Sequence, residues 1–129
     1  MTIAFFSDGH GNLPALLAVL ADANVLLFGH PHKPYHWTFA SEVAGETCYR
    51  HALNIGSMGK PKDGDPRVAY QLLRLDGHTT LTDPASVRSE LVRVSYGVEK
   101  TALAVEASPL PNEYADMLRK AYQRFPISP

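Results

Sequence analysis

The chain has 129 residues, which is enough for one domain with a hydrophobic core and too few to argue for two. Hydrophobic residues make up 45% of it, as in ordinary globular proteins, which argues against disorder. Its 12 Lys and Arg nearly balance its 13 Asp and Glu. This balance gives no electrostatic case for specific nucleic-acid binding or for a membrane surface, both of which usually need a basic face.

Three features predict where the protein resides. Its single cysteine, Cys48, cannot form an intrachain disulfide, which favours a reducing compartment. The first apolar run has no basic residue before it and stops at Ser7, so we expect no signal peptide. The apolar stretch 13–28 contains Asp22 and Asn24 and is therefore too polar to span a bilayer. We expect a soluble, cytoplasmic protein without a membrane partner.

The first 28 residues predict a strand, a helix and a second strand. Residues 3–6 and 25–28 are short and wholly apolar, which is typical of strands buried on both faces. Between them, Pro14 suits a first helical turn, and leucines recur at helical spacing through Leu20. This order predicts a βαβ unit with parallel strands.

The rest of the chain reads as antiparallel strands followed by helices. In chain order we expect strands at 35–40 and 46–53 around a turn at 44–45, a loop at 54–66, a strand at 68–75, a hairpin turn at 76–77 into a strand at 78–81, further β-structure at 87–96, and helices at 98–107 and from Pro111 onward. The pattern shows no repeat and no linker, so we expect a single α/β domain over residues 1–129.

The loops that follow the two parallel strands predict a metal site. They contain Asp8-Gly9-His10 and His30-Pro31-His32, so that each loop offers potential ligands one residue apart, which point the same way in an extended segment. Both loops should leave the carboxyl edge of the sheet, where open α/β folds bind ligands. Two imidazoles and a carboxylate can bind an ion and leave positions for water or substrate, and the ion would act as a Lewis acid.

Either motif alone would be a weak signal, because loops often use Asp and His in caps and turns. Their joint appearance after successive buried strands is more specific. The other candidates have simpler explanations as packed, turn or solvated residues: His36, His51 and Cys48 in expected strands, and His78, Asp63, Asp65, Lys60, Lys62 and Arg67 in expected loops. The three basic residues could equally attract an anion.

Several segments resemble the calcineurin-like metallophosphoesterase superfamily. Residues 3–16 are similar to its opening Asp-x-His-Gly-Asn motif, and residues 25–34 are similar to its closing Gly-His-x-His motif. Residues 54–67, and the tail with Val94-Ser95-Tyr96 and Leu110-Pro111, resemble its small bacterial phosphodiesterase branch. The resemblance covers nearly the whole chain. It implies a reduced version of the family's four-layer αββα sandwich, with an N-terminal βαβ unit, antiparallel strands and C-terminal helices.

The resemblance also implies roles for individual residues. Asp8, His10 and His32 would bind one divalent ion, with Mn, Fe, Ni or Zn as candidates, and His30 would remain for a second ion. His30 and His32 would thereby be the catalytic histidines. Three further residues lie beside the site in the family pattern, where they are equally explained by turns, and would contact the bound phosphate: Asn12, Asn54 and Ser57.

The family's middle motifs are missing. Its Gly-Asp motif, its Gly-Asn-His motif and a further histidine do not occur, and the chain passes from the first helix to the closing-motif strand around residues 22–24. The resemblance therefore implies one metal site that is nearly whole and a second that has lost most of its ligands. It also implies the loss of the histidine that protonates the leaving group.

These observations favour a metal-dependent phosphoesterase, a hydrolase of small phosphate mono- or diesters with weakened activity. One alternative is a non-catalytic descendant that binds metal or a partner. Another is an internally deleted version of an enzyme of ordinary length. Because the missing middle should leave apolar surface uncovered, we expect a homodimer.

Overall fold

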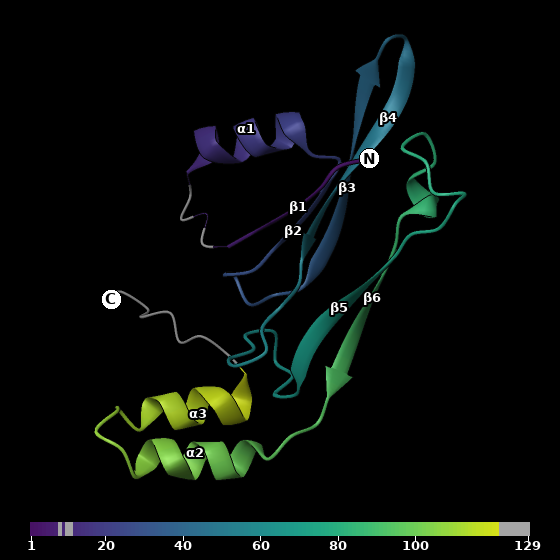
Figure 1. Ribbon diagram of the computed structural model, residues 1–129. Helices are drawn as coiled ribbons and strands as arrows, with labels where there is room; N and C mark the ends of the chain where they lie inside the picture. The colour runs from purple at the N-terminus through teal and green to yellow at the C-terminus, as the bar shows by residue number, and fades with distance from the viewer. Residues whose placement is uncertain (8, 10–11, 122–129) are drawn as a thin grey trace.

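The computed structural model describes residues 1–7, 9 and 12–121, and these form two β-sheets, three α-helices and a short 3₁₀ helix (Figure 1). Among these residues, no helix is long and apolar enough to cross a membrane.

The expected βαβ unit is present. Strands β1 (Ile3–Phe6) and β2 (Val25–Phe28) flank helix α1 (Leu13–Asp22), and they pair in parallel with Ile3 opposite Val25. Asn12 begins the helix, because its side-chain oxygen accepts a hydrogen bond from the backbone N–H of Ala15 at 3.2 Å.

Strands β3 (Tyr35–Val43) and β4 (Glu46–Asn54) form the expected antiparallel hairpin. Its turn, Ala44 and Gly45, has φ values of 52° and 82°, as a tight hairpin turn requires. Strand β4 also pairs in parallel with β2, which gives a four-stranded sheet in the order β1-β2-β4-β3.

Strands β5 (Val68–Arg74) and β6 (Arg88–Val94) form a separate antiparallel sheet. The predicted strand at 78–81 is wrong: the chain between β5 and β6 is a loop that contains the 3₁₀ helix η1 (Pro84–Ser86). Side chains hold this loop. The Asp76 carboxylate accepts from the His78 backbone N–H at 2.8 Å, and the Ser86 hydroxyl accepts from that of Thr80 at 2.9 Å. These local bonds replace the ladder of a hairpin.

Helices α2 (Val98–Glu106) and α3 (Glu113–Lys120) pack against each other beyond the end of β6, far from α1 (Figure 1). Arg119 of α3 forms ion pairs with Glu99 and Glu106 of α2. The helix predicted from Pro111 onward is confirmed over Glu113–Lys120 and ends there, since Ala121 has a left-handed φ of 49°. Residues 122–129 lie outside the described residues.

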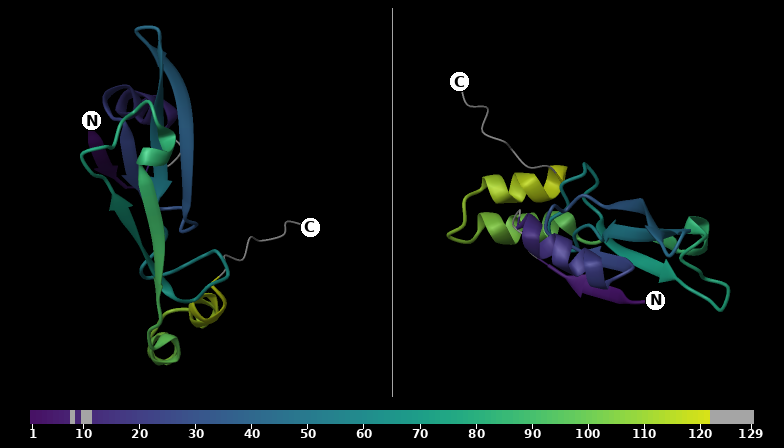
Figure 2. Two further views of the ribbon diagram at one scale, coloured as in Figure 1. Left: turned by 90° about the vertical axis from the view of Figure 1, so that its right-hand side faces the viewer. Right: turned by 90° about the horizontal axis from the view of Figure 1, so that it is seen from above.

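The core lies between the two sheets. Buried Val25, Leu27 and Leu53 of the first sheet contact Val87, which directly precedes β6, and Ile3 and Leu73 pack around them. Helix α1 lies over the opposite face of the first sheet (Figure 2), where Arg50 of β4 donates a hydrogen bond to the Leu20 carbonyl. The order of layers is thus helix, sheet, sheet, with the α2–α3 pair at the end.

Much apolar surface remains open. Helix α1 is described along its whole length, and none of its residues is buried. The molecule exposes 8347 Å², whereas a compact monomer of 14.1 kDa should expose about 6,700 Å².

Candidate metal centre

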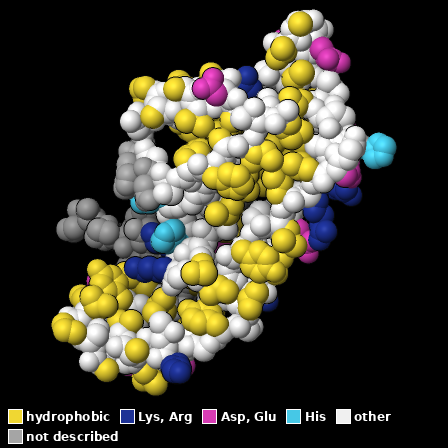
Figure 3. Space-filling model, in the orientation of Figure 1, with side chains coloured by type: hydrophobic (Ala, Val, Ile, Leu, Met, Phe, Trp, Pro, Cys, Tyr) yellow, Lys and Arg dark blue, Asp and Glu magenta, His cyan; other side chains and the backbone are white. Residues whose placement is uncertain are grey.

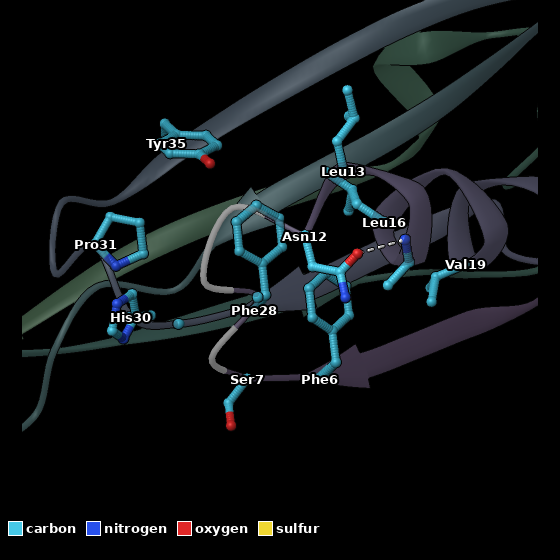
Figure 4. Close-up of a pocket in the computed structure, with 13 residues that line it drawn as sticks. Phe6, Ser7, Asn12, Leu13, Leu16, Val19, Phe28, His30, Pro31 and Tyr35 are labelled. Atoms are coloured by element: carbon cyan, nitrogen blue, oxygen red, sulfur yellow. Dashed lines mark hydrogen bonds between the residues drawn. The ribbon is translucent and has the colours of Figure 1, made fainter.

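The loops after β1 and β2 begin side by side. Phe6 and Phe28, the last residues of the two strands, are opposite each other in the parallel register, and their rings stack with centroids 5.1 Å apart. Asp8 and His10 lie outside the described residues. The described neighbours of both loops, including Ser7, Gly9 and His30, line one pocket of about 500 Å³ under α1 (Figure 4).

The His32 side chain is fixed by a backbone carbonyl. Its Nδ1 lies 2.7 Å from the Lys60 carbonyl oxygen, and a carbonyl can only accept, so Nδ1 carries the proton. The Lys62 backbone N–H also donates to the His32 carbonyl, at 3.2 Å. This arrangement leaves the Nε2 lone pair for a ligand, as in metal-binding histidines whose other nitrogen is fixed by a backbone carbonyl.

The surroundings of His32 favour its neutral form. Burial is the largest cause that lowers its pKa, and the nearby positive charges of Lys62, His30 and Lys60 lower it further, against the opposing effect of the hydrogen bond to the Lys60 carbonyl. A metal binds only the neutral imidazole. The tautomer and the lowered pKa of His32 thus both suit a metal ligand.

The backbone of the His30-Pro31-His32 loop is unusual. His30 has φ = 93° and His32 has φ = 58°, which is the left-handed region that side chains other than glycine rarely adopt. Such conformations cost on the order of 1–3 kcal/mol each, and they gather at functional sites where the surrounding structure fixes them. Both histidines of the predicted motif thus sit in backbone conformations that local sterics disfavour.

Among the described residues, no group of three or more His, Cys, Asp or Glu is placed to hold a metal ion. A metal centre that includes His32 therefore needs further ligands, and Asp8 and His10 are the predicted ones.

The three predicted phosphate contacts have structural hydrogen bonds. Asn12 caps α1, the buried Asn54 accepts from the Gly56 N–H at 3.0 Å, and the Ser57 hydroxyl accepts from the Lys60 N–H at 2.9 Å. Asn54 and Ser57 shape the turn that presents the Lys60 carbonyl to His32. Their contact with phosphate stays a prediction.

Other carboxylates near this loop are engaged by arginines. Asp63 forms an ion pair with Arg93, and Asp65 pairs with Arg67 at 2.6 Å. Hydrogen bonds from Arg67 lower the pKa of Asp65 to about 2. The Asp63–Arg93 pair ties the loop to β6, and the Asp65–Arg67 pair lies within the loop, in line with the turn role expected for both aspartates.

A histidine network lies on the other face of the first sheet. His36 Nε2 is 2.9 Å from His51 Nδ1, and His36 Nδ1 is 2.9 Å from the Ser89 hydroxyl of β6. His51 is fully buried and His36 is partly buried, in line with the structural role expected for both. Sequence reasoning missed the network itself, which links the two sheets.

This network predicts a loss of stability in acid. Burial lowers the pKa of His36 and of His51, and the neighbouring His36 lowers that of His51 further. The unfolded chain therefore binds more protons, so the free energy of unfolding should be constant above pH ~6.5 and fall below it, by at most about 1.4 kcal/mol per pH unit for each histidine.

Urea unfolding at pH 7.5 and 5.5 measures this loss. His36→Gln should reduce the difference in the free energy of unfolding between the two pH values. His78→Ala, in the exposed loop before β6, should leave this difference unchanged. An identical pH dependence in His36→Gln and the wild type would contradict the assignment.

No family model and no curated protein sequence matches the chain. Among solved structures, it is similar to a metallophosphoesterase from Sphaerobacter thermophilus, with a TM-score of 0.57 and 23% identity over 84% of this chain and 47% of that one. The chain has a metallophosphoesterase fold.

Two structures of Vps29 from Entamoeba histolytica, the wild type complexed with zinc and a double mutant, are more distant. Their TM-scores are 0.35 and 0.32, at 25% and 24% identity, covering 70% and 67% of this chain and 54% and 52% of theirs. The chain thus spans about half the length of the structures it matches. At these identities the metallophosphoesterase likeness establishes the fold, and the predicted reduced α/β fold is confirmed.

Proposed function

We propose that the chain is a metal-dependent phosphoesterase that hydrolyses small phosphate mono- or diesters slowly, with one ion bound by Asp8, His10 and His32. The observation that carries this proposal is the state of His32. Its Nδ1 is fixed by the Lys60 carbonyl at 2.7 Å, burial lowers its pKa and so favours the neutral form, and it follows the strand beside the loop of Asp8 and His10 in a metallophosphoesterase fold.

The ligand set suits Mn, Fe, Ni or Zn, because all of these accept imidazole and carboxylate ligands. When bound, such an ion supplies a Lewis acid for the phosphoryl group and for water. His30 shares the strained loop with His32. We propose that His30 contacts the substrate or a weakly held second ion.

Lysines would attract the substrate anion. Lys62 is joined to the His32 carbonyl by its backbone N–H, so its side chain begins beside the site. The Lys60 ammonium lies 4.7 Å from the centre of the Tyr114 ring, which orients this side chain toward α3. We therefore expect Lys62 to contribute more to phosphate binding than Lys60.

The pocket under α1 adjoins the site and suits the apolar part of an ester. The rings of Phe6, Phe28 and Tyr35 form its sheet side, and Leu13, Leu16 and Val19 form its helix side (Figure 4). Such a mixture of apolar walls and a few polar groups is usual for small-molecule sites.

The open apolar surface favours a second role beside catalysis. Exposed leucines on α1 suit a partner, so a non-catalytic metal- or partner-binding descendant remains the competing function, and we propose that the partner is a second copy of the chain.

Hydrolysis of p-nitrophenyl phosphate esters with added Mn²⁺ tests the enzyme. The wild type should show weak turnover that depends on the ion, and His32→Ala should reduce it to the background rate. His78→Ala, a histidine in the exposed loop before β6, is the matched control and should keep the activity. Equal turnover in His32→Ala and the wild type would rule the proposal out.

A further inference from the structure

We propose that two copies of the chain associate through the open edge of β1, which pairs antiparallel with β1 of the second copy. This proposal deepens the self-association proposed above, and it is independent of the metal chemistry.

Strand β1 is an edge strand with no charged side chain. Among the described strands it stands at the end of the order β1-β2-β4-β3. The Thr2 carbonyl accepts a hydrogen bond from the Val25 N–H at 3.2 Å, and the Thr2 N–H donates one to the Asn24 side chain at 2.7 Å. Backbone groups alternate in direction along a strand, so Ile3 and Phe5 direct theirs away from β2. An unprotected apolar edge of this kind is a template for another strand.

Apolar side chains flank this edge on both faces. Phe5 is 76% exposed, and it lines a shallow pocket of about 320 Å³ with Leu27, Ile55, Met58 and Tyr70 on the side of β5. On the other side, Leu13, Leu16 and Leu17 of α1 are exposed. Figure 3 shows hydrophobic side chains gathered between α1 and β5 on the face of the molecule that is turned toward the viewer.

The area available is sufficient for a dimer. The chain exposes 8347 Å², which is roughly 1,600 Å² more than a compact monomer of its mass. A stable interface takes about 800 Å² from each partner. The excess over the whole chain is thus as large as a stable dimer interface needs.

A two-fold axis at Ala4 satisfies the open backbone groups. It places Ile3 opposite Phe5 of the second copy, and Phe5 opposite its Ile3, so that each pair exchanges two backbone hydrogen bonds. The exposed Phe5 ring then packs beside the partner's Ile3. The other edge strand of the four-stranded sheet, β3, is less suited, because it carries His36 and the charged Glu42.

Sedimentation at 10 to 100 µM protein, in EDTA, tests the interface. The wild type should be a dimer. Phe5→Lys adds a charge to the edge, and Phe5→Pro removes an outward N–H while sparing the bonds to β2, so each should weaken association at least tenfold. Leu103→Lys on α2 and Trp37→Lys on β3, at side chains 54% and 57% exposed, are the matched controls and should dimerise like the wild type.

A cross-link tests the register. Ala4 would face Ala4 of the second copy as a non-hydrogen-bonded pair with Cα atoms about 4.5 Å apart, which a disulfide can bridge. With Cys48→Ser as background, Ala4→Cys should give a covalent dimer on oxidation, and Ser41→Cys on β3 should not.

Three sedimentation results would overturn the proposal. The first is that Phe5→Lys and Phe5→Pro dimerise as stably as the wild type, the second is that only Trp37→Lys loses the dimer, and the third is that the wild type is a monomer. The absence of a covalent dimer after oxidation of Ala4→Cys would also overturn it. Circular dichroism confirms that each variant is folded. Because all measurements are made without metal, a failure of the interface and a failure of the phosphoesterase proposal are distinguishable.

Discussion

With Mn²⁺ present, turnover should fall steeply as the leaving group of the ester becomes more basic. General acid catalysis is typically worth about 10²–10⁴-fold, and the histidine that the metallophosphoesterase resemblance assigns to this step is missing from the sequence. An aryl leaving group such as p-nitrophenolate scarcely needs a proton, whereas an alkoxide does. The missing general acid should therefore slow the hydrolysis of alkyl esters by about this factor more than it slows the hydrolysis of aryl esters.

The measurement is kcat/KM for a series of phosphate esters of increasing leaving-group pKa, with EDTA and His32→Ala as blanks. A shallow dependence, with an unactivated diester turned over as readily as a p-nitrophenyl ester, would contradict this expectation. It would mean that His30 or a residue of a second copy supplies the proton.

Leu53→Ala should lower the free energy of unfolding by about 2–5 kcal/mol, because it opens a cavity in a core that cannot fully collapse. Leu53 is fully buried in the central strand β4, where it contacts Val25, Leu27 and Val87, and the last of these belongs to the segment that begins the second sheet. The mutation therefore weakens both the packing within the first sheet and the contact between the two sheets.

Urea unfolding monitored by circular dichroism measures this effect. Leu103→Ala, at a side chain 54% exposed on α2, is the control and should change stability by no more than about 0.5 kcal/mol. A loss below about 1 kcal/mol for Leu53→Ala would show that the two sheets do not depend on this core.

The first sheet was predictable because its signals are local. Residues 3–6 and 25–28 are apolar runs that end at polar, glycine-bearing loops, and the structure confirms them as parallel strands with Phe6 opposite Phe28. The turn at Ala44 and Gly45 likewise lies where the sequence places it. In each case the pattern of side chains and the requirement for backbone hydrogen bonds agree.

The error at 76–81 has a local cause as well. Asp76-Gly77 is typical of a hairpin turn, but the Asp76 side chain accepts from the backbone of His78, and Thr80 and Ser86 bond each other across the loop. Composition alone does not tell which of these competing bonds forms.

The site was predictable only in part. The sequence places His32 in the loop after the second strand, as the structure has it, but its bond to the Lys60 carbonyl joins residues 28 apart and depends on the turn at Ser57. The His36–His51–Ser89 network depends on the second sheet folding over the first, which no local pattern indicates.

The number of divalent ions bound per chain tests the central claim most directly. After loading with Mn²⁺ or Zn²⁺ and dialysis, elemental analysis should find one ion in the wild type and in His78→Ala, and none in His32→Ala or Asp8→Ala. A wild type that retains no ion, or a His32→Ala variant that retains as much as the wild type, would contradict a metal centre at this edge of the sheet.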